Sequence, residues 1–220
     1  MNGTTALAEA IAALPEQPKV LVSGSAMGYY GAHRGDELLD EESAPGTDFL
    51  ASTARDWEQA TSAASAAGIR VVLSRTGLVL GAEGGALQRM VPPFRFGIGG
   101  RLGSGRQWMS WISLHDTVRA LRFFIDNPAM RGPVNLVAPE PARNADFTTT
   151  LARELGRPAF LPVPAVALEL LFGTMADNTI LASQRLTPKR LAGAGFEFRH
   201  PRLDDALCFE LTRSGGRAGR

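Results

Sequence analysis

Val-Leu-Val-Ser-Gly-Ser-Ala-Met-Gly-Tyr-Tyr-Gly occupies residues 20–31, and the interpretation of the whole chain starts from it. Its apolar beginning is too short and too β-branched for a helix, and Gly24 and Gly28 interrupt it, so it predicts a buried strand. Ligands of open α/β sheets lie at the carboxyl ends of the strands. A cleft there would be lined by Ser23, Ser25, Tyr29 and Tyr30. The alternative is a polar turn whose tyrosines pack as half-buried rings.

Size and composition indicate a globular α/β protein. The 220 residues suffice for one well-cored domain with a small subdomain. With a net charge of +1, no global field favours nucleic acid or an anionic membrane as a partner. No run approaches the roughly 20 apolar residues of a membrane span, and no signal peptide is apparent, so a cytoplasmic location is expected.

Cysteine and histidine usage excludes some kinds of site. The single cysteine, Cys208, excludes an internal disulfide, and its apolar surroundings predict a core position. The three histidines, at positions 33, 115 and 200, have no partner at metal-ligand spacing. No metal site is therefore expected.

Helices and strands alternate along the chain in the order of a parallel sheet. Further strands are expected at 69–75 and 133–138, and helices at 4–14, 48–67, 115–127, 144–156 and up to Gly173. Asp116 is the expected cap of the 115–127 helix. A strand, a helix and a strand at this spacing form a right-handed βαβ unit.

The remaining segments are expected to be less regular. Residues 32–47 are acidic and resemble a solvated loop, and a short helix over 87–96 is expected to break at Pro92-Pro93. The glycine-rich stretch at 97–112 offers Arg106 for anions and Trp108 and Trp111 as flat apolar surface, although its alternation also fits a strand. After Gly173 we expect short helices rather than more sheet, with a disordered tail at 212–220.

Four stretches together resemble the extended short-chain dehydrogenase/reductase superfamily, in its atypical, epimerase-like branch of sugar-nucleotide epimerase homologues. These are the serine- and tyrosine-containing turn at 23–31, Arg-Thr-Gly-Leu-Val-Leu-Gly at 75–81, the tryptophan-containing stretch at 103–112, and Pro-Val-Asn-Leu-Val-Ala-Pro-Glu-Pro at 133–141. The resemblance extends from about Thr4 to Leu211. It implies a Rossmann-type parallel sheet, a nicotinamide cofactor that is most simply NADP, and a mostly helical C-terminal substrate subdomain.

The implied organisation is a partial cofactor-binding domain over 1–140 and a substrate cap over 141–211. Members of the superfamily begin with a strand and a glycine-rich turn that precede the position of Thr4. No G-x-G-x-x-G pattern occurs anywhere in this sequence, so the pyrophosphate loop is missing and the chain is expected to be truncated. Weak NADP binding is the expected consequence.

The superfamily's catalytic Tyr-x-x-x-Lys pair is also missing. Tyrosine occurs only at 29 and 30 and lysine only at 19 and 189, and Lys19 precedes Ser25 by six residues of strand, which places it at the wrong end of the sheet. By resemblance, Ser25 takes the substrate-orienting role, with Tyr29 or Tyr30, of which we favour Tyr30, as the nearby acid. Without a neighbouring cation, the pKa of that phenol is expected to stay near 10.

The resemblance assigns the remaining site residues in two groups. Cofactor contacts fall on Ser23, Gly24, Arg75, Gly77 and Leu78. Substrate contacts fall on Tyr29, Arg106, Trp108 and Trp111.

Three functions remain open. The leading one is an NADP-linked oxidoreductase or epimerase-like protein, weakened or inactive, that acts on a small molecule such as a nucleotide-sugar; formation of a homo-oligomer is left open. The second is a nucleotide-binding protein without catalysis. The third is a serine hydrolase, because Ser25, Asp116 and His200 follow the chain order of the α/β-hydrolase triad, but the flanking glycines of a nucleophile elbow are absent.

Overall fold

The computed structural model describes residues 2–173 and 175–215, and its centre is a three-stranded parallel sheet. The strands β1 (Val20–Ala26), β3 (Arg70–Thr76) and β7 (Gly132–Leu136) lie in the order β1-β3-β7, so β1 forms one edge. All three were expected from their apolar runs, and the predicted parallel βαβ arrangement is confirmed. The same register aligns Ser25 with Arg75 and Arg75 with Asn135 in one row.

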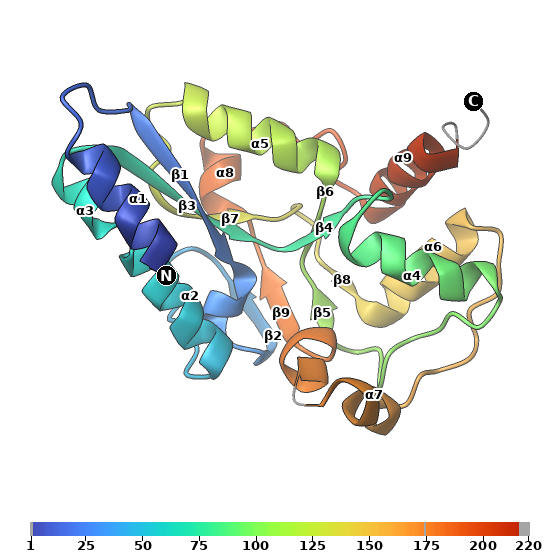
Figure 1. Cartoon of the computed structure of the whole chain (residues 1–220). Coiled ribbons are helices and arrows are strands. Elements are labelled where there is room, and N and C mark those ends of the chain that lie inside the picture. Colours follow the sequence, from blue (N-terminus) through green and yellow to red (C-terminus); the bar gives the residue numbers. More distant parts are fainter. Residues whose placement is uncertain (1, 174, 216–220) are drawn as a thin grey trace.

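Helices cover both faces of this sheet (Figure 1). On one face, α1 (Asn2–Ala12) and α3 (Ser62–Ala66) pack against β3 through Ala8, Ala64 and Val71. On the other, α5 (Leu114–Asp126) and α8 (Lys189–Gly193) enclose Val72 and Val134. The α/β class expected from the sequence is confirmed, because neighbouring strand residues bury apolar side chains on opposite faces.

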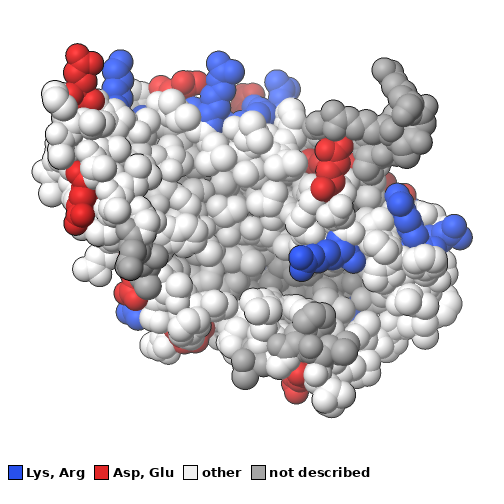
Figure 2. Space-filling view, in the orientation of Figure 1, with Lys and Arg blue, Asp and Glu red and all other residues white. Residues whose placement is uncertain are grey.

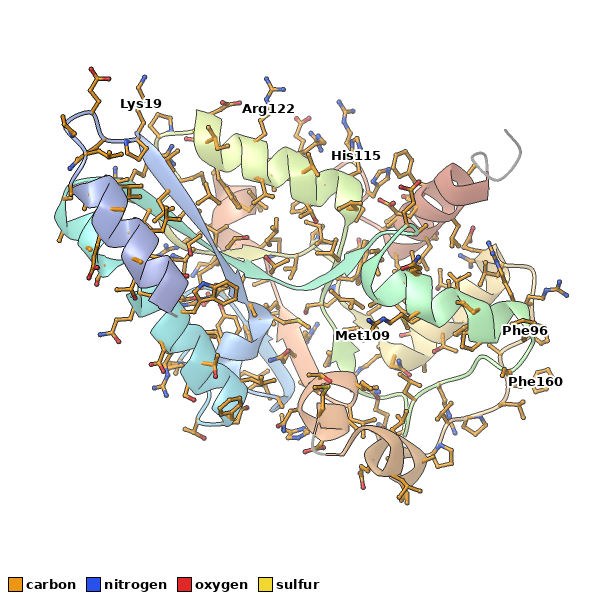
Figure 3. The ribbon with its side chains drawn as sticks, in the orientation of Figure 1. Lys19, Phe96, Met109, His115, Arg122 and Phe160 are labelled. Atoms are coloured by element: carbon orange, nitrogen blue, oxygen red, sulfur yellow. The ribbon has the colours of Figure 1, made fainter. Side chains whose placement is uncertain are left out.

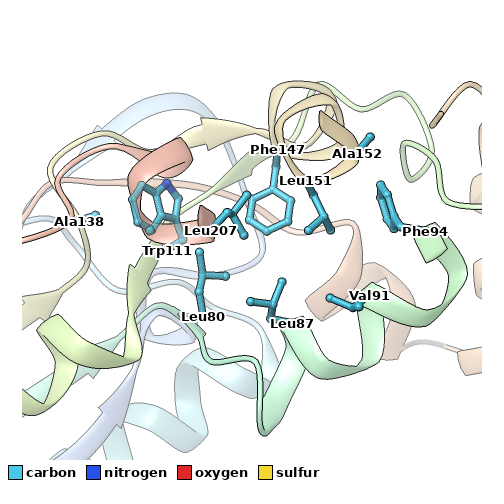
Figure 4. Packing of buried hydrophobic residues seen from close by; sticks show 11 residues of the cluster. Leu80, Leu87, Val91, Phe94, Trp111, Ala138, Phe147, Leu151, Ala152 and Leu207 are labelled. Atoms are coloured by element: carbon cyan, nitrogen blue, oxygen red, sulfur yellow. The ribbon is translucent and has the colours of Figure 1, made fainter. Parts of the chain in front are cut away.

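A second region continues from the carboxyl ends of these strands. Its short strands pair as β4 (Leu78–Leu80) with β6 (Trp111–Ser113) and as β5 (Trp108–Met109) with β8 (Ala142–Arg143). Around them lie α4 (Gly85–Arg95), α6 (Asn144–Glu154), α7 (Ala165–Phe172) and α9 (Leu203–Gly215). Their shared core contains Leu80, Leu87, Trp111, Phe147 and Leu207 (Figure 4).

The prediction of a loop for the acidic segment is wrong in part. Residues 33–39 form β2 (His33–Leu39), which pairs in parallel with β9 (Ser183–Leu186), whereas residues 40–47 form no helix or strand, as expected. The partner strand lies in the region where only short helices were expected, so that expectation is wrong in part. A short polar strand gains its hydrogen bonds from a segment about 150 residues away, and its own side chains carry no sign of that pairing.

Smaller corrections concern helices and their ends. The expected 48–67 helix divides into α2 (Phe49–Gln59) and α3, and α4 runs through Pro92 and Pro93 because both prolines face solvent. Cys208 is exposed on α9 rather than in the core. The same helix continues through Gly215, into the expected disordered tail, whose residues 216–220 lie outside the described residues.

Across residues 2–173 and 175–215, no helix combines the length and the apolar character needed to cross a membrane.

Candidate functional site

A row of buried polar residues ends the three central strands. Ser25, Arg75 and Asn135 lie side by side in register, and all three are almost inaccessible to solvent. Buried polar groups are costly unless they are hydrogen-bonded, so their partners define what this row can do. Lys19, exposed before the first residue of β1, lies at the opposite end of that strand (Figure 3), as expected.

Arg75 is the centre of this polar cluster. Its Nε and Nη2 donate to the two carboxylate oxygens of Glu58 at 2.8 and 2.9 Å, and its Nη1 donates to the Tyr30 hydroxyl at 3.0 Å. The guanidinium carbon lies 3.4 Å from the centroid of the Tyr29 ring, a cation–π contact. Burial on its own would lower the pKa of Arg75, but the bonds to Glu58 raise it, so the side chain stays charged. All three guanidinium nitrogens are thus bonded within the protein.

Tyr30 is fully buried beside this cation. Its hydroxyl donates to Asn135 Oδ1 at 2.7 Å and accepts from Arg75. Burial raises the pKa of Tyr30 to about 12, and the opposing effect of Arg75 is smaller. The expectation of a phenol with no cation nearby and a pKa near 10 is therefore corrected on both points. A phenol with this pKa keeps its proton at neutral pH.

Ser25 shares the carboxylate of Glu58 with Arg75. Its Oγ donates to Glu58 Oε1 at 2.7 Å, so the hydroxyl already has a partner.

Among the residues predicted to contact the cofactor, Ser23 is buried and points its hydroxyl toward its own strand, at 3.4 Å from the Gly24 carbonyl. A Cβ at Gly24 would lie 3.3 Å from the Trp57 ring, which accounts for glycine there by packing.

Three members of the cluster were not predicted from the sequence as site residues. They are Glu58 on α2, Asn135 on β7, and Glu41, a buried member of the acidic run whose Oε1 accepts from the Asn135 backbone N–H at 3.0 Å. Asn135 could have been found, because an amide within the apolar run at 133–138 needs a buried partner. The partners of the other two come from distant parts of the chain, and no local pattern marks them.

An apolar cavity of about 660 Å³ lies beside the polar cluster. It begins at Met27, directly after β1, and passes between β4, β5, α4 and the turn at 176–180. Figure 3 places Met109 near the middle of the molecule, and Figure 2 shows a hollow near the centre of this face with mainly uncharged surface and one cationic group at its edge. The lining residues are Met27, Leu78, Gly85, Ala86, Arg89, Met90, Leu102, Trp108, Met109, Thr179, Ile180, Ala182 and Gln184.

The predicted ligand contacts divide around this cavity. Leu78 and Trp108 line it, and Tyr29 stacks on Arg75 in the polar cluster. Arg106 is exposed and does not line the cavity, and Trp111 is completely buried in the second core.

Gly77 has a role in packing. A Cβ at this position would lie 2.6 Å from Val137 Cγ1, so only glycine allows the approach.

The triad expected from the chain order Ser25, Asp116 and His200 does not form. Ser25 is bonded to Glu58, whereas His200 Nδ1 lies 3.1 Å from the Ser113 hydroxyl and 4.0 Å from Asp116. The cap of α5 is Ser113 rather than the expected Asp116. Ser113 does not replace Ser25 as a nucleophile, because it is fully buried and no acyl group of a substrate can reach its hydroxyl. Burial lowers the pKa of His200. The contacts among Ser113, Asp116 and His200 join the start of α5 to the segment before α9.

Family models match two parts of the chain. Residues 1–137 match the NAD dependent epimerase/dehydratase family, and residues 163–209 match a domain of unknown function, DUF1731. The epimerase family protein Mb2239 of Mycobacterium bovis is 51% identical over 195 residues, covering 89% of this chain and 64% of the relative. The epimerase family protein MW0731 of Staphylococcus aureus is 38% identical over 207 residues, covering 94% of this chain and 69% of the relative. The chain thus spans less than two thirds of the length of the mycobacterial protein.

Two solved structures share the fold. The human epimerase family protein SDR39U1, solved with NADPH, superposes with a TM-score of 0.90 at 33% identity, covering 96% of this chain and 71% of that chain. A nucleoside-diphosphate sugar epimerase from Corynebacterium glutamicum superposes with a TM-score of 0.79 at 39% identity, covering 94% of this chain and 40% of that chain.

Proposed function

The chain belongs to the NAD-dependent epimerase/dehydratase family, and on that premise we propose that it acts in a nicotinamide-dependent oxidoreductase or epimerase-like reaction on a small molecule. The observation that carries the proposal is the position of the cavity. It begins at Met27, two residues beyond Ser25, at the end of the sheet where ligands of α/β proteins bind. The human relative with the same fold was solved with NADPH.

The residues of this chain fit one end of such a cofactor. Leu78 and Met27 offer apolar surface on which a nicotinamide ring can lie, and the bound ring would accept or supply a hydride. The pyrophosphate end finds no match among the described residues, because the sequence has no G-x-G-x-x-G turn and Arg75 is buried and bonded to Glu58 and Tyr30. NADP remains the proposed cofactor, with weak binding to this chain.

Within this proposal, Ser25 orients the substrate. Its hydroxyl lies at the end of β1 and would exchange its bond to Glu58 for one to a substrate oxygen. Arg75 and Glu58 are positioning residues, because they hold Ser25 without facing the cavity. Tyr30 keeps its proton and stabilises the arrangement through Asn135.

Hydride transfer tests the proposal directly. The purified chain is incubated with NADPH and a panel of ketones and aldehydes, and the absorbance of the reduced nicotinamide is followed. We expect slow oxidation that Ser25→Ala lowers by at least tenfold, while Ser23→Ala, which removes a hydroxyl from the same strand, has a much smaller effect. No cofactor oxidation with any substrate, or equal loss in both variants, would contradict the proposal.

Binding without catalysis is the second candidate function. It is favoured because the two hydroxyls that could transfer a proton, those of Ser25 and Tyr30, are already hydrogen-bonded to other residues of the protein. A non-catalytic protein would bind NADPH, as seen by calorimetry, and leave its absorbance unchanged with every substrate of the panel.

A further inference from the structure

The walls of the cavity are more apolar than their residue types suggest. Trp108 Nε1 donates to Asp36 at 2.7 Å, and the Thr179 hydroxyl donates to the Met175 carbonyl at 2.6 Å. The amide nitrogen of Gln184 donates to the carbonyls of Met27 and Gly31 at 3.0 and 2.7 Å. Each of these donors is turned to protein, so these three residues present mainly carbon surface to a ligand.

Three methionines give the cavity an adaptable lining. Met27, Met90 and Met109 come from three separate elements and meet around it, with Leu78 and Ile180 completing the apolar surface. The thioether is polarisable and makes favourable contacts with aromatic rings, and its side chain adjusts to different shapes. The Trp108 ring also lines the cavity, and the guanidinium carbons of Arg143 and Arg185 lie 4.1 and 4.6 Å from its centroid, so it offers a ligand mainly the ring edge. Such walls select a ring-containing, apolar ligand.

Charge on the cavity wall is limited to one residue. Among the described residues that line it, only Arg89 is charged, and this side chain is exposed on α4. A diphosphate, as in a nucleotide-sugar, carries two or more charges and is usually held by several cations or backbone N–H groups. One guanidinium matches one carboxylate.

We propose that the cavity binds an apolar, ring-containing molecule that bears a single carboxylate, with Arg89 pairing the carboxylate and the methionines and Trp108 enclosing the ring. This inference rests on the proposed function insofar as the ligand is the substrate, which would then lie against the nicotinamide ring at the Met27 and Leu78 end of the cavity. A volume of about 660 Å³ is within the range of cavities that hold a compound of a few fused rings. The substrate class then differs from the nucleotide-sugars expected from the resemblance.

Calorimetry with three probes tests this class. The probes are 2-naphthoate, its neutral analogue 2-naphthamide, and UDP-glucose. We expect 2-naphthoate to bind at least tenfold more tightly than UDP-glucose. Arg89→Ala should weaken 2-naphthoate about ten- to hundredfold, the loss of one charge-assisted contact, and leave 2-naphthamide unchanged. Arg95→Ala, on the same helix but outside the cavity, is the control and should change neither.

A cavity-filling variant tests the location. Ala86→Leu on α4 adds volume inside the cavity and should weaken both naphthalene probes at least tenfold, with thermal unfolding measured to confirm that the variant is folded. Tighter binding of UDP-glucose, or unchanged naphthoate binding in a folded Ala86→Leu, would overturn the proposal. Naphthoate binding without any cofactor oxidation would instead overturn the catalytic function and keep the ligand class.

Discussion

The polar cluster and the apolar cavity meet at the end of β1 but are built in opposite ways. In the cluster, Arg75, Glu58, Tyr30 and Ser25 bond to one another, and each nitrogen of Arg75 has a protein partner. In the cavity, carbon surface faces a space of about 660 Å³ that the protein does not fill. Saturated buried networks rigidify a structure, whereas unfilled apolar space binds ligands. The comparison therefore assigns stability to the cluster, apart from the Ser25 hydroxyl that we propose to orient the substrate, and it favours the cavity as the place of ligand recognition.

The largest expected effect is on the stability of the cluster. Glu58→Gln leaves Arg75 as a buried charge without its carboxylate, and breaking such a pair costs about 3–5 kcal/mol of unfolding free energy. The matched control is Glu37→Gln, which breaks the exposed pair with Arg34 and should cost less than about 1 kcal/mol. Urea unfolding of both variants gives the comparison. Equal losses would show that the cluster is no more important for stability than a surface pair.

Tyr30→Phe should have the next largest effect. The change removes one hydroxyl and leaves Asn135 Oδ1 and Arg75 Nη1 each short of a partner, at a cost of about 1–3 kcal/mol. Tyr29→Phe is the control, because the Tyr29 hydroxyl makes no hydrogen bond to a described residue, while its ring still stacks on Arg75. An equal loss of unfolding free energy in the two variants would show that the Tyr30 hydroxyl does not stabilise the cluster.

The same residue predicts a loss of stability in alkali. Because burial raises the pKa of Tyr30 from 10.0 to about 12, the unfolded chain releases this proton first as the pH rises. The contribution of this pKa difference to the unfolding free energy is complete below about pH 10 and is lost as the pH approaches 12, on the order of 3 kcal/mol in all. Unfolding free energies at pH 8 to 12 should fall less steeply in Tyr30→Phe than in the unchanged chain. Parallel curves would contradict the buried, protonated phenol.

The smallest effect is expected at Arg106, outside both regions. The sequence predicted it as the anion contact, but it is exposed and does not line the cavity. Arg106→Ala should change the unfolding free energy by less than about 0.5 kcal/mol and leave 2-naphthoate affinity unaltered. Loss of naphthoate binding in this variant would move the ligand out of the cavity and revive the original assignment.

The central strands could be predicted from the sequence because their side chains carry the signal locally. The apolar runs of β1, β3 and β7 pack against helices on both faces of the sheet, most deeply in β3 and β7, and a glycine or turn ends each expected segment. β2 could not be predicted, since its pairing with β9 depends on contacts across about 150 residues. The exposure of Cys208 was missed for a related reason, because apolar neighbours in sequence do not say which face of α9 is covered.

The site shows the same division. Ser25, Arg75, Leu78 and Trp108 were found through stretches that resemble a known family, and their assigned roles remain predictions. Glu58 was not predicted, although it holds both Ser25 and Arg75, because its partners come from the strands β1 and β3. The methionines of the cavity were missed because they come from separate elements, at spacings that no motif describes.

Methionine methyl resonances report directly on whether a ligand binds in the apolar cavity. The chain has six methionines; Met27, Met90 and Met109 line the cavity, and Met130 is buried in the core between the sheet and α5. In a titration of methyl-labelled chain with 2-naphthoate, followed by NMR, we expect the three cavity resonances to shift together along one binding curve while Met130 stays in place. Shifts confined to other methionines, or spread equally to Met130, would contradict the assignment of ligand recognition to the cavity.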